Sequence, residues 1–321
     1  MEPVIEERPG CSKQARRFAR FMRYVIRPIF FYSPLTPAML RAAVVLDVFA
    51  PLLMRRARDT RIERVDLGGF HGEWVRPGGV SGSGRVILFL HGGGFFCCGL
   101  RTHRKLVERI AQRSDAVAFS VAYRQLPGAP LSTSMADALD GYRILLEQGH
   151  APQNIVIAGD SAGGFLAFTT ALKALRRGFP APAGIVALSP MVDLDHEARA
   201  SYPFTTKDVY IPVHRLEGLK KLLLADAMDG DPLPSPCDQD LRNLPPVFMQ
   251  VGSREGLRWD AELMAERLAA ADVPHRLQIW EDQIHVFPAF AGVIPEGLQA
   301  IDEIAAFIRE TTYPKPADAA A

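Results

Sequence analysis

Two glycine-containing motifs carry the residue types that could perform chemistry in this chain. They are His91–Phe95 (HGGGF) and Gly159–Gly163 (GDSAG). A serine on a tight turn between a strand and a helix is a typical nucleophile, and the backbone amides of a glycine run can donate to an oxygen that gains negative charge. The motifs therefore predict Ser161 as a nucleophile, with an oxyanion hole made by the N–H groups of Gly93, Gly94 and Ala162.

The residues around Ser161 strengthen this interpretation. A G-x-S-x-G pattern arises by chance too often to carry the argument alone. Here a short apolar run, 154–158, precedes the motif, and an apolar helical run, 165–172, follows it. That is the strand, turn and helix order that a nucleophile turn needs. The alternative, a glycine-rich turn without a catalytic role, accounts less well for this order.

The strand before the first motif is the apolar run 85–90, which predicts a buried central strand. A phosphate-binding turn is the alternative for the glycines after it, but the G-x-G-x-x-G spacing is missing. We interpret His91 as a structural residue that holds the loop, rather than as a group that transfers protons.

A serine nucleophile needs a base, and the histidines after Ser161 are His196, His214, His275 and His285. His275 begins the alternating run 275–280, so its side chain is expected to be committed to the sheet or its edge. His285 follows that strand in a loop, where catalytic residues commonly lie. We predict His285 as the base.

Proteins that carry a nucleophilic serine on a turn between a strand and a helix order their triad along the chain as serine, acid, histidine. Three acids between Ser161 and His285 could therefore orient the base. Glu255 lies in the loop after the apolar strand 246–251 and is the preferred candidate. Asp260 begins the next predicted helix, where capping and the helix dipole explain an acid. Asp282 is only three residues before His285, a separation that usually points the side chain elsewhere.

These motifs resemble those of the bacterial esterases related to hormone-sensitive lipase (family IV) within the α/β-hydrolase superfamily. His91–Gly94 is similar to the family's HGGG motif and Gly159–Gly163 to its GDSAG motif. Tyr123-Arg124 looks like its YR signature, and Asp231–Pro236 resembles its DPLxSP segment. The resemblance implies a serine carboxylesterase acting on short- to medium-chain esters through an acyl-enzyme, without a metal or organic cofactor.

The chain departs from the family pattern at two places. The family's acid motif is Asp-Pro-Leu, whereas the matching positions here are Glu255–Leu257, which places the carboxylate one methylene further from the backbone. The glutamate that commonly follows the YR pair is missing from Gln125–Gly128. An acyltransferase or an amidase could use the same triad. A non-catalytic binding protein of this fold is a further alternative, which the presence of His285 disfavours.

The fold class expected is α/β, with a mostly parallel central sheet, helices on both faces and a helical cap. Apolar strand runs alternate with helical stretches near 102–113, 134–148, 162–177, 260–271 and 296–310. We predict a cap segment over 1–61, a catalytic domain over 62–321, and a second cap piece near 196–230, which contains a helix around 216–227 and interrupts the alternation.

Positive charge is concentrated at the amino end of the chain. The 321 residues have a net charge of +1, but residues 1–61 contain 12 Lys and Arg against 5 Asp and Glu, leaving −6 for the remainder. An amphipathic helix is predicted over 12–26, ended by Pro28. Two interpretations remain: a cap packed over the active site, or a basic helix that also rests on an anionic lipid surface.

Other partners and sites follow from composition. No signal peptide or membrane span is recognised, so we expect a cytoplasmic protein. Peripheral association with a membrane and formation of a homodimer are two further expectations that stay open. The four cysteines, Cys11, Cys97, Cys98 and Cys237, have no metal-binding spacing and are expected to be reduced. Asp229 and Asp231 do not form a calcium loop. No nucleic-acid motif is present, so the expected partner is a small-molecule ester.

Overall fold

The structure is a computed structural model. It describes residues 1–43, 45, 47–49, 59–195, 197–203, 208–209, 211–212, 215–224 and 235–312. His196, His214, Asp229 and most of the segment compared with DPLxSP lie outside the described residues, as does much of the predicted second cap piece.

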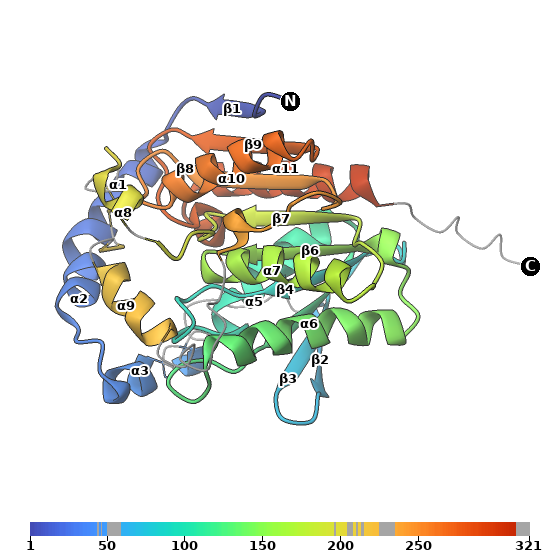
Figure 1. The fold of residues 1–321 in the computed structure, drawn as a ribbon. Helices are drawn as coiled ribbons and strands as arrows, with labels where there is room; N and C mark the ends of the chain where they lie inside the picture. Colours follow the sequence, from blue (N-terminus) through green and yellow to red (C-terminus); the bar gives the residue numbers. More distant parts are fainter. Residues whose placement is uncertain are drawn as a thin grey trace, which may run out of the picture.

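One mostly parallel sheet forms the centre of the protein (Figure 1). Within the described residues it has nine strands, in the spatial order β1-β9-β8-β7-β6-β4-β5-β3-β2. Only the pairs β2 with β3 and β3 with β5 are antiparallel. The strands are β1 (Ile5–Arg8), β2 (Arg61–Asp66), β3 (His71–Arg76), β4 (Val86–Leu90), β5 (Val117–Ala122), β6 (Ile155–Asp160), β7 (Gly184–Leu188), β8 (Val247–Gly252) and β9 (His275–Trp280).

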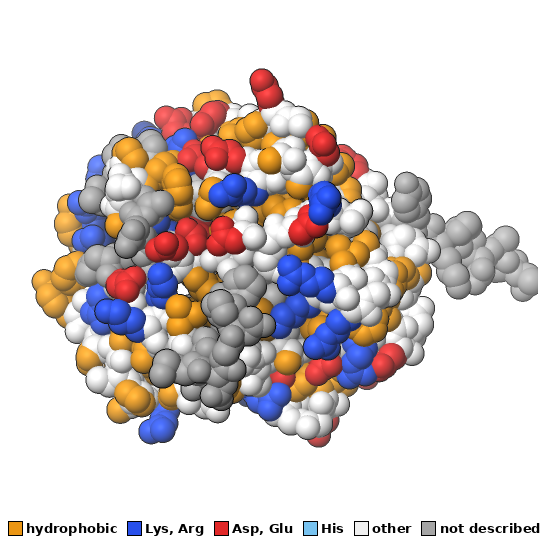
Figure 2. All heavy atoms as spheres, in the orientation of Figure 1, with side chains coloured by type: hydrophobic (Ala, Val, Ile, Leu, Met, Phe, Trp, Pro, Cys, Tyr) orange, Lys and Arg blue, Asp and Glu red, His pale blue; other side chains and the backbone are white. Residues whose placement is uncertain are grey.

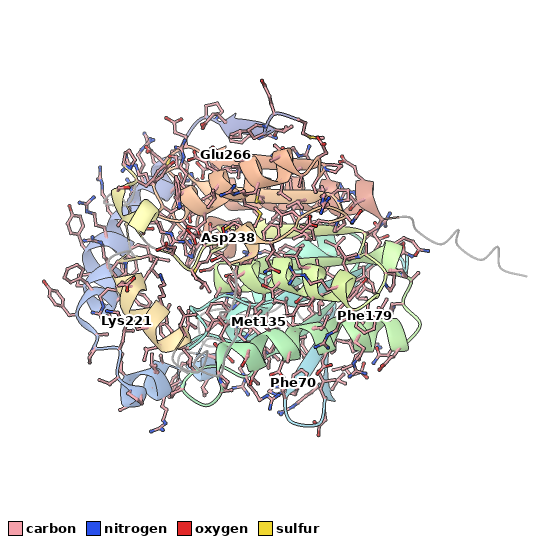
Figure 3. The ribbon with its side chains drawn as sticks, in the orientation of Figure 1. Phe70, Met135, Phe179, Lys221, Asp238 and Glu266 are labelled. Carbon is pink, nitrogen blue, oxygen red and sulfur yellow. The ribbon has the colours of Figure 1, made fainter. Side chains whose placement is uncertain are left out.

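Helices cover both faces of this sheet. Residues of α5 and α11 pack on one face with Ile87 and Phe248, and residues of α6, α7 and α10 pack on the other with Leu88 and Met249. Met135 of α6, labelled in Figure 3, belongs to the second layer. The helices are α1 (Lys13–Phe21), α2 (Arg27–Tyr32), α3 (Pro37–Ala43), α5 (Leu100–Arg113), α6 (Leu131–Glu147), α7 (Ala162–Arg176), α8 (Glu197–Ser201), α9 (Leu216–Leu223), α10 (Arg258–Ala270) and α11 (Pro295–Thr311).

The central strands are buried over their whole length. Every residue of β4, β6, β7 and β8 is buried, as expected for parallel strands covered on two faces. β4 pairs with β6, and β6 with β7, in parallel register. The loops that follow these three strands therefore meet at one edge of the sheet, where α/β proteins place their sites.

The amino-terminal segment differs from the prediction in two respects. Ile5–Arg8 is a strand, β1, paired in parallel with the edge strand β9, so residues 1–61 are not entirely cap. Pro28 does not end the helix: a π-helical turn over Met22–Ile26 leads directly into α2, where Pro28 stands in the first turn.

Helices α1, α2, α3, α8 and α9 lie together at the left in Figure 1, beyond the carboxyl ends of β6 and β7. Among the described residues, no helix combines the length and the apolar character needed to span a bilayer.

Candidate functional site

Ser161 occupies a strained turn between β6 and α7. Its backbone has φ 53° and ψ −118°, a region that non-glycine residues rarely adopt. A Cβ at Gly159 would lie 2.2 Å from the carbonyl oxygen of Gly163, and one at Gly163 would lie 1.9 Å from that of Leu90. Both glycines are therefore required for the strand and helix to approach closely enough to form the turn.

The glycine loop after β4 lies beside this turn. Gly93 has φ +116° and Gly94 φ +61°, and a Cβ at Gly93 would lie 2.0 Å from the carbonyl oxygen of Cys97. Within the described residues, no acceptor is found for the backbone amides of Gly93, Gly94 and Ala162. These three amides are therefore available to a ligand oxygen, as an oxyanion hole requires.

A buried ion pair holds the glycine loop against the serine turn. The amide of Gly92 donates to Asp160 Oδ1 at 3.0 Å, and His103 Nε2 lies 3.1 Å from Asp160 Oδ2. Burial disfavours a charged imidazole, but the Asp160 carboxylate outweighs burial and raises the pKa of His103 to about 9. Sequence reasoning missed this contact, because nothing in the predicted helix singles out His103.

His91 has the structural role that was predicted for its position. Its buried ring stacks on Tyr123, with centroids 4.3 Å apart, and its Nδ1 lies 2.8 Å from the carbonyl oxygen of Gly92. Burial and the charge on His103 lower the pKa of His91 to about 4, so its ring is neutral near pH 7. The Tyr123 hydroxyl donates to the His91 carbonyl at 2.7 Å.

Glu255 and His285 meet at the ends of β8 and β9. His285 Nδ1 lies 2.6 Å from Glu255 Oε2, and both side chains are buried. Burial alone would lower the pKa of His285, but the Glu255 charge and hydrogen bond outweigh it and raise that pKa above the ordinary 6.5. The arrangement favours an imidazole with its proton on Nδ1, so that the unprotonated nitrogen, which can accept a proton, is Nε2.

The loop after β7 ties this pair to the serine turn. Ser189 Oγ donates to Glu255 Oε1 at 2.8 Å and accepts from the amide of Val286 at 3.0 Å. The Ser161 amide donates to the Leu188 carbonyl, and the Ser161 carbonyl accepts from the Met191 amide. Residues 188–191 therefore contact both halves of the site, a role that no sequence motif indicated.

The two rival acids have other partners. Asp260 lies in the first turn of α10, but it does not cap the helix as predicted: its carboxylate accepts from the amides of Val192 and Asp193 and pairs with the fully buried Arg199. The Asp282 carboxylate accepts from Arg254 Nε at 2.6 Å. Of the three candidates, only Glu255 contacts His285 among the described contacts.

His275 is committed to the sheet edge, as predicted. Its Nδ1 lies 2.8 Å from the Val273 carbonyl, and its Nε2 accepts from the Val4 amide beside β1. The contact with Val4 covers an edge that would otherwise be open.

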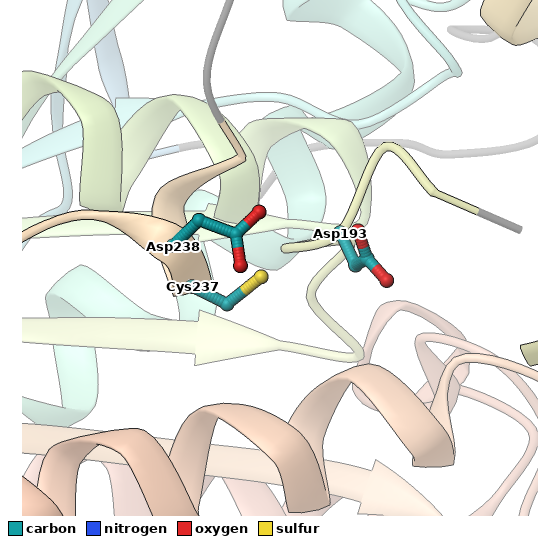
Figure 4. Close-up of side chains that lie close together, drawn as sticks. All are labelled: Asp193, Cys237 and Asp238. Atoms are coloured by element: carbon teal, nitrogen blue, oxygen red, sulfur yellow. The ribbon is translucent and has the colours of Figure 1, made fainter. Parts of the chain in front are cut away.

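Asp193, Cys237 and Asp238 form a group of described residues whose ligand atoms lie within 4.8 Å of one another (Figure 4). Burial raises the pKa of both Asp193 and Cys237, so the thiol stays protonated near pH 7. Asp193 Oδ1 already accepts from the Asp195 amide and from Ser235 Oγ. Protein contacts account for Asp193, and a protonated thiol is a poor metal ligand, so the group carries no metal assignment.

Helix α9 connects the amino-terminal helices to the site. Arg215, which precedes it, donates to the carbonyls of Phe31 and Ser33 at 2.6 Å each. Leu219 Cδ2 lies 3.6 Å from the position that a Cβ would take at Gly94. Side chains of α9 therefore lie directly beside the glycine loop.

Known proteins resemble this chain over most of its length. A family model described as alpha/beta hydrolase fold matches residues 87–289. "Esterase LipU" of Mycobacterium tuberculosis is 34% identical over 296 residues, which cover 89% of this chain and 99% of the relative. "Carboxylesterase/phospholipase LipF" of the same organism is 33% identical over 320 residues, covering 97% and 85%. A crystal structure titled as an esterase from the bacterial hormone-sensitive lipase family has a TM-score of 0.84 and 31% identity, covering 95% of this chain and 100% of that one.

Proposed function

Because this chain belongs to the α/β-hydrolase fold family, and within it to the esterases related to hormone-sensitive lipase, it is a carboxylic ester hydrolase, and we propose that Ser161, His285 and Glu255 carry out the reaction. One observation carries the assignment: the buried contact of 2.6 Å between Glu255 and His285, joined by Ser189 and the 188–191 loop to the Ser161 turn.

The proposed reaction is acyl transfer in two steps. Ser161 Oγ attacks the ester carbonyl carbon while His285 Nε2 accepts the hydroxyl proton, and Glu255 stabilises the imidazolium that forms. His285 then donates that proton to the leaving alcohol. In the second step, His285 activates a water that hydrolyses the acyl-enzyme.

Negative charge that develops on the carbonyl oxygen is met by the amides of Gly93, Gly94 and Ala162. Each preorganised donor of this kind lowers the barrier by about 3 to 4 kcal/mol. The ion pair of Asp160 with His103 supports this role, because it fixes the neighbouring Gly92 amide. These groups suffice for ester hydrolysis by nucleophilic catalysis, so the proposal requires no metal or organic cofactor.

We propose that the substrates are esters of short to medium acyl chains, because the chain resembles the esterases related to hormone-sensitive lipase. With p-nitrophenyl esters from acetate to palmitate, kcat/KM is expected to peak at or below octanoate and to be at least about 10-fold lower for palmitate. A maximum at palmitate would contradict the proposed preference for short to medium acyl chains.

Adding a primary alcohol tests the acyltransferase alternative. If transfer of the acyl group to the alcohol were faster than hydrolysis, the acyltransferase assignment would replace the hydrolase assignment.

The activity should depend on pH through His285. A catalytic base must be unprotonated, so kcat/KM falls as the pH drops through the pKa of His285 in the free enzyme. Because Glu255 raises that pKa, the midpoint of the acid limb is expected above 6.5. Initial rates at subsaturating p-nitrophenyl butyrate between pH 5 and 9 measure it. A midpoint below 6.5 would contradict the pairing of His285 with Glu255.

We propose that residues 9–60 form a cap over the site together with a second piece near 196–230, and that β1 and the rest of residues 61–321 form the catalytic domain. The contacts of Arg215 with Phe31 and Ser33, and of α9 with the glycine loop, support this division.

We further propose that α1 and α2 contact an anionic lipid surface from the cytoplasm. Residues 13–32 contain six basic residues and no acidic one, and large apolar side chains are exposed there: Tyr24 by 73%, Ile29 by 57% and Tyr32 by 79%. Figure 2 shows basic and hydrophobic side chains mixed along this edge of the molecule. Such a face suits a negatively charged membrane interface, and the four free cysteines suit a reducing compartment.

Point substitutions test the lipid contact better than truncation, which would remove β1 from the sheet. The triple change Tyr24→Ser, Ile29→Ser and Tyr32→Ser is expected to weaken co-sedimentation with phosphatidylglycerol vesicles about 10-fold or more, while soluble-ester turnover is retained. The matched control changes the exposed Val293 and Leu298 to serine. Equal binding by both variants would contradict the proposal, and a concentration-dependent dimer lost in the triple variant would assign this face to a homodimer instead.

A further inference from the structure

Two adjacent thiols follow the glycine loop, and the proposed mechanism uses neither. The sulfur atoms of Cys97 and Cys98 lie 3.8 Å apart, and both cysteines are free. Cys97 is buried, whereas Cys98 is partly exposed. A partly exposed thiol with a second thiol at its side is the arrangement of cysteines that respond to oxidants.

We propose that Cys98 is a site of oxidation by hydroperoxides and that Cys97 is its resolving thiol, so that a disulfide between them reversibly lowers ester hydrolysis. The effect on activity rests on the proposed function of the same site, because it acts through the oxyanion donors.

The surroundings of Cys98 favour its thiolate. Contact with Cys97 lowers the pKa of Cys98 against the opposing effect of burial, and the charge on His103 and a hydrogen bond with Thr102 lower it further. Contact with Cys98 and burial raise the pKa of Cys97. The Cys97 thiol donates to the Gly93 carbonyl at 3.1 Å. Cys98 is therefore the member of the pair that ionises first, and thiolates are the species that hydroperoxides oxidise.

The chemistry balances with hydrogen peroxide as the oxidant. The Cys98 thiolate attacks one peroxide oxygen, the O–O bond breaks, and after proton uptake the products are a Cys98 sulfenic acid and water. The Cys97 sulfur then attacks the Cys98 sulfur. The S–O bond breaks, the hydroxide leaves with the Cys97 proton as water, and an S–S bond forms. The two thiols lose two electrons and two protons, and the peroxide is reduced to two waters.

A disulfide between neighbours in sequence is strained. Their Cα atoms are about 3.8 Å apart across a trans peptide, below the usual range of about 4.4 to 6.8 Å for a disulfide. Strained disulfides are reduced more easily than structural ones. The bond is therefore expected to open again under thiol reductants.

Closing this bond would disturb the oxyanion hole through Gly93. The Cys97 amide and thiol both donate to the Gly93 carbonyl, at 3.0 and 3.1 Å. The Cys97 carbonyl packs so closely on Gly93 that it leaves no room for a Cβ there. Cys98 has a positive φ of 63°, so the 97–98 peptide has little freedom to adjust locally. Oxidation removes the thiol hydrogen that Gly93 accepts and rotates this peptide against Gly93.

The test uses the full-length enzyme, reduced and then freed of reductant. Hydrogen peroxide is expected to lower p-nitrophenyl butyrate turnover about 10-fold, and dithiothreitol is expected to restore it. In the oxidised enzyme, the tryptic peptide Val86–Arg101, which contains both cysteines, should be lighter by two hydrogen atoms.

Variants distinguish the effect of Cys97 and Cys98 from that of the other thiols. For each variant, the rate after peroxide treatment is compared with the rate of the same variant without treatment. The double variant Cys11→Ser, Cys237→Ser should respond like the wild type, and Cys98→Ser should not respond. Cys97→Ser should hold a Cys98 sulfenic acid that dimedone labels. Equal inactivation of Cys98→Ser and wild type, or inactivation without the mass change, would overturn the proposal. If the untreated enzyme hydrolysed no ester, the function would fail, while the peptide mass would still decide whether the pair is oxidised.

Discussion

Replacing Ser161 with alanine is expected to lower kcat for p-nitrophenyl butyrate by about 10⁴- to 10⁶-fold. Alanine removes the only atom that forms the acyl-enzyme, while the amides of Gly93, Gly94 and Ala162 keep their positions. Because Ser161 makes its turn with a backbone that alanine can adopt as well as serine does, the fold should be retained. The residual rate comes from substrate binding and the oxyanion hole alone.

The matched control for this substitution is Ser132→Ala, at an exposed position on α6. It should leave the rate within about twofold of the wild type, since surface changes of this kind alter little. Thermal unfolding of both variants checks that the fold is unchanged. A Ser161→Ala enzyme that kept a tenth of the wild-type kcat would refute Ser161 as the nucleophile.

Glu255→Gln is expected to lower kcat by about 10³- to 10⁴-fold. Glutamine has nearly the same shape as glutamate, so the loss comes from a change in the tautomer of the His285 ring. Both oxygens of Glu255 accept hydrogen bonds: Oε1 from Ser189 and the Gly252 amide, and Oε2 from His285. Glutamine has one acceptor oxygen. If it stays with Ser189 and Gly252, its NH₂ group faces His285 Nδ1, and the ring proton moves to Nε2. The base is then occupied at the atom that must accept the Ser161 proton.

Two further variants sharpen this result. Glu255→Asp keeps the charge but shortens the side chain by one methylene, so it should lose less activity than glutamine does. Asp282→Asn removes the acid three residues before His285, whose carboxylate pairs with Arg254, and should retain most activity. In Glu255→Gln the acid limb of the pH profile should move to lower pH, because burial then acts on His285 without the opposing carboxylate. If Asp282→Asn and Glu255→Gln lost equal activity, the assignment of Glu255 as the acid that orients His285 would be contradicted.

Elements with strong local patterns were predictable from the sequence. The apolar runs 85–90 and 246–251 match β4 and β8 to within one residue at each end, the alternating run 275–280 coincides with β9, and the predicted helix at 162–177 differs from α7 by one residue at its end. Buried parallel strands are nearly uniform in hydrophobicity, and long helices repeat their apolar face. The catalytic candidates stood beside these elements, in loops whose positions the strands determine.

The contacts that join distant segments were not predictable. Ser189, His103 and the pair of Arg199 with Asp260 each act through a partner more than fifty residues away in sequence, and their neighbours in sequence are ordinary strand, loop or helix residues. β1 was missed because Ile5–Arg8 alternates between exposed and half-buried residues and contains three charged side chains. Its strand conformation depends on pairing with β9 rather than on local preference.

The pairing of β1 with β9 sets an order of events during synthesis. The Leu277 amide donates to the Val4 carbonyl, and the Glu281 amide donates to the Arg8 carbonyl. Among the described strands, β1 therefore has no partner until β9, which is synthesised after all the others, has been made. Until then, the basic and apolar helices that follow β1 are anchored at only one end, and their exposed side chains are open to chaperones and to association with other chains. Pairing of β1 with β9 is therefore expected late in folding, because contacts between residues far apart in sequence form slowly.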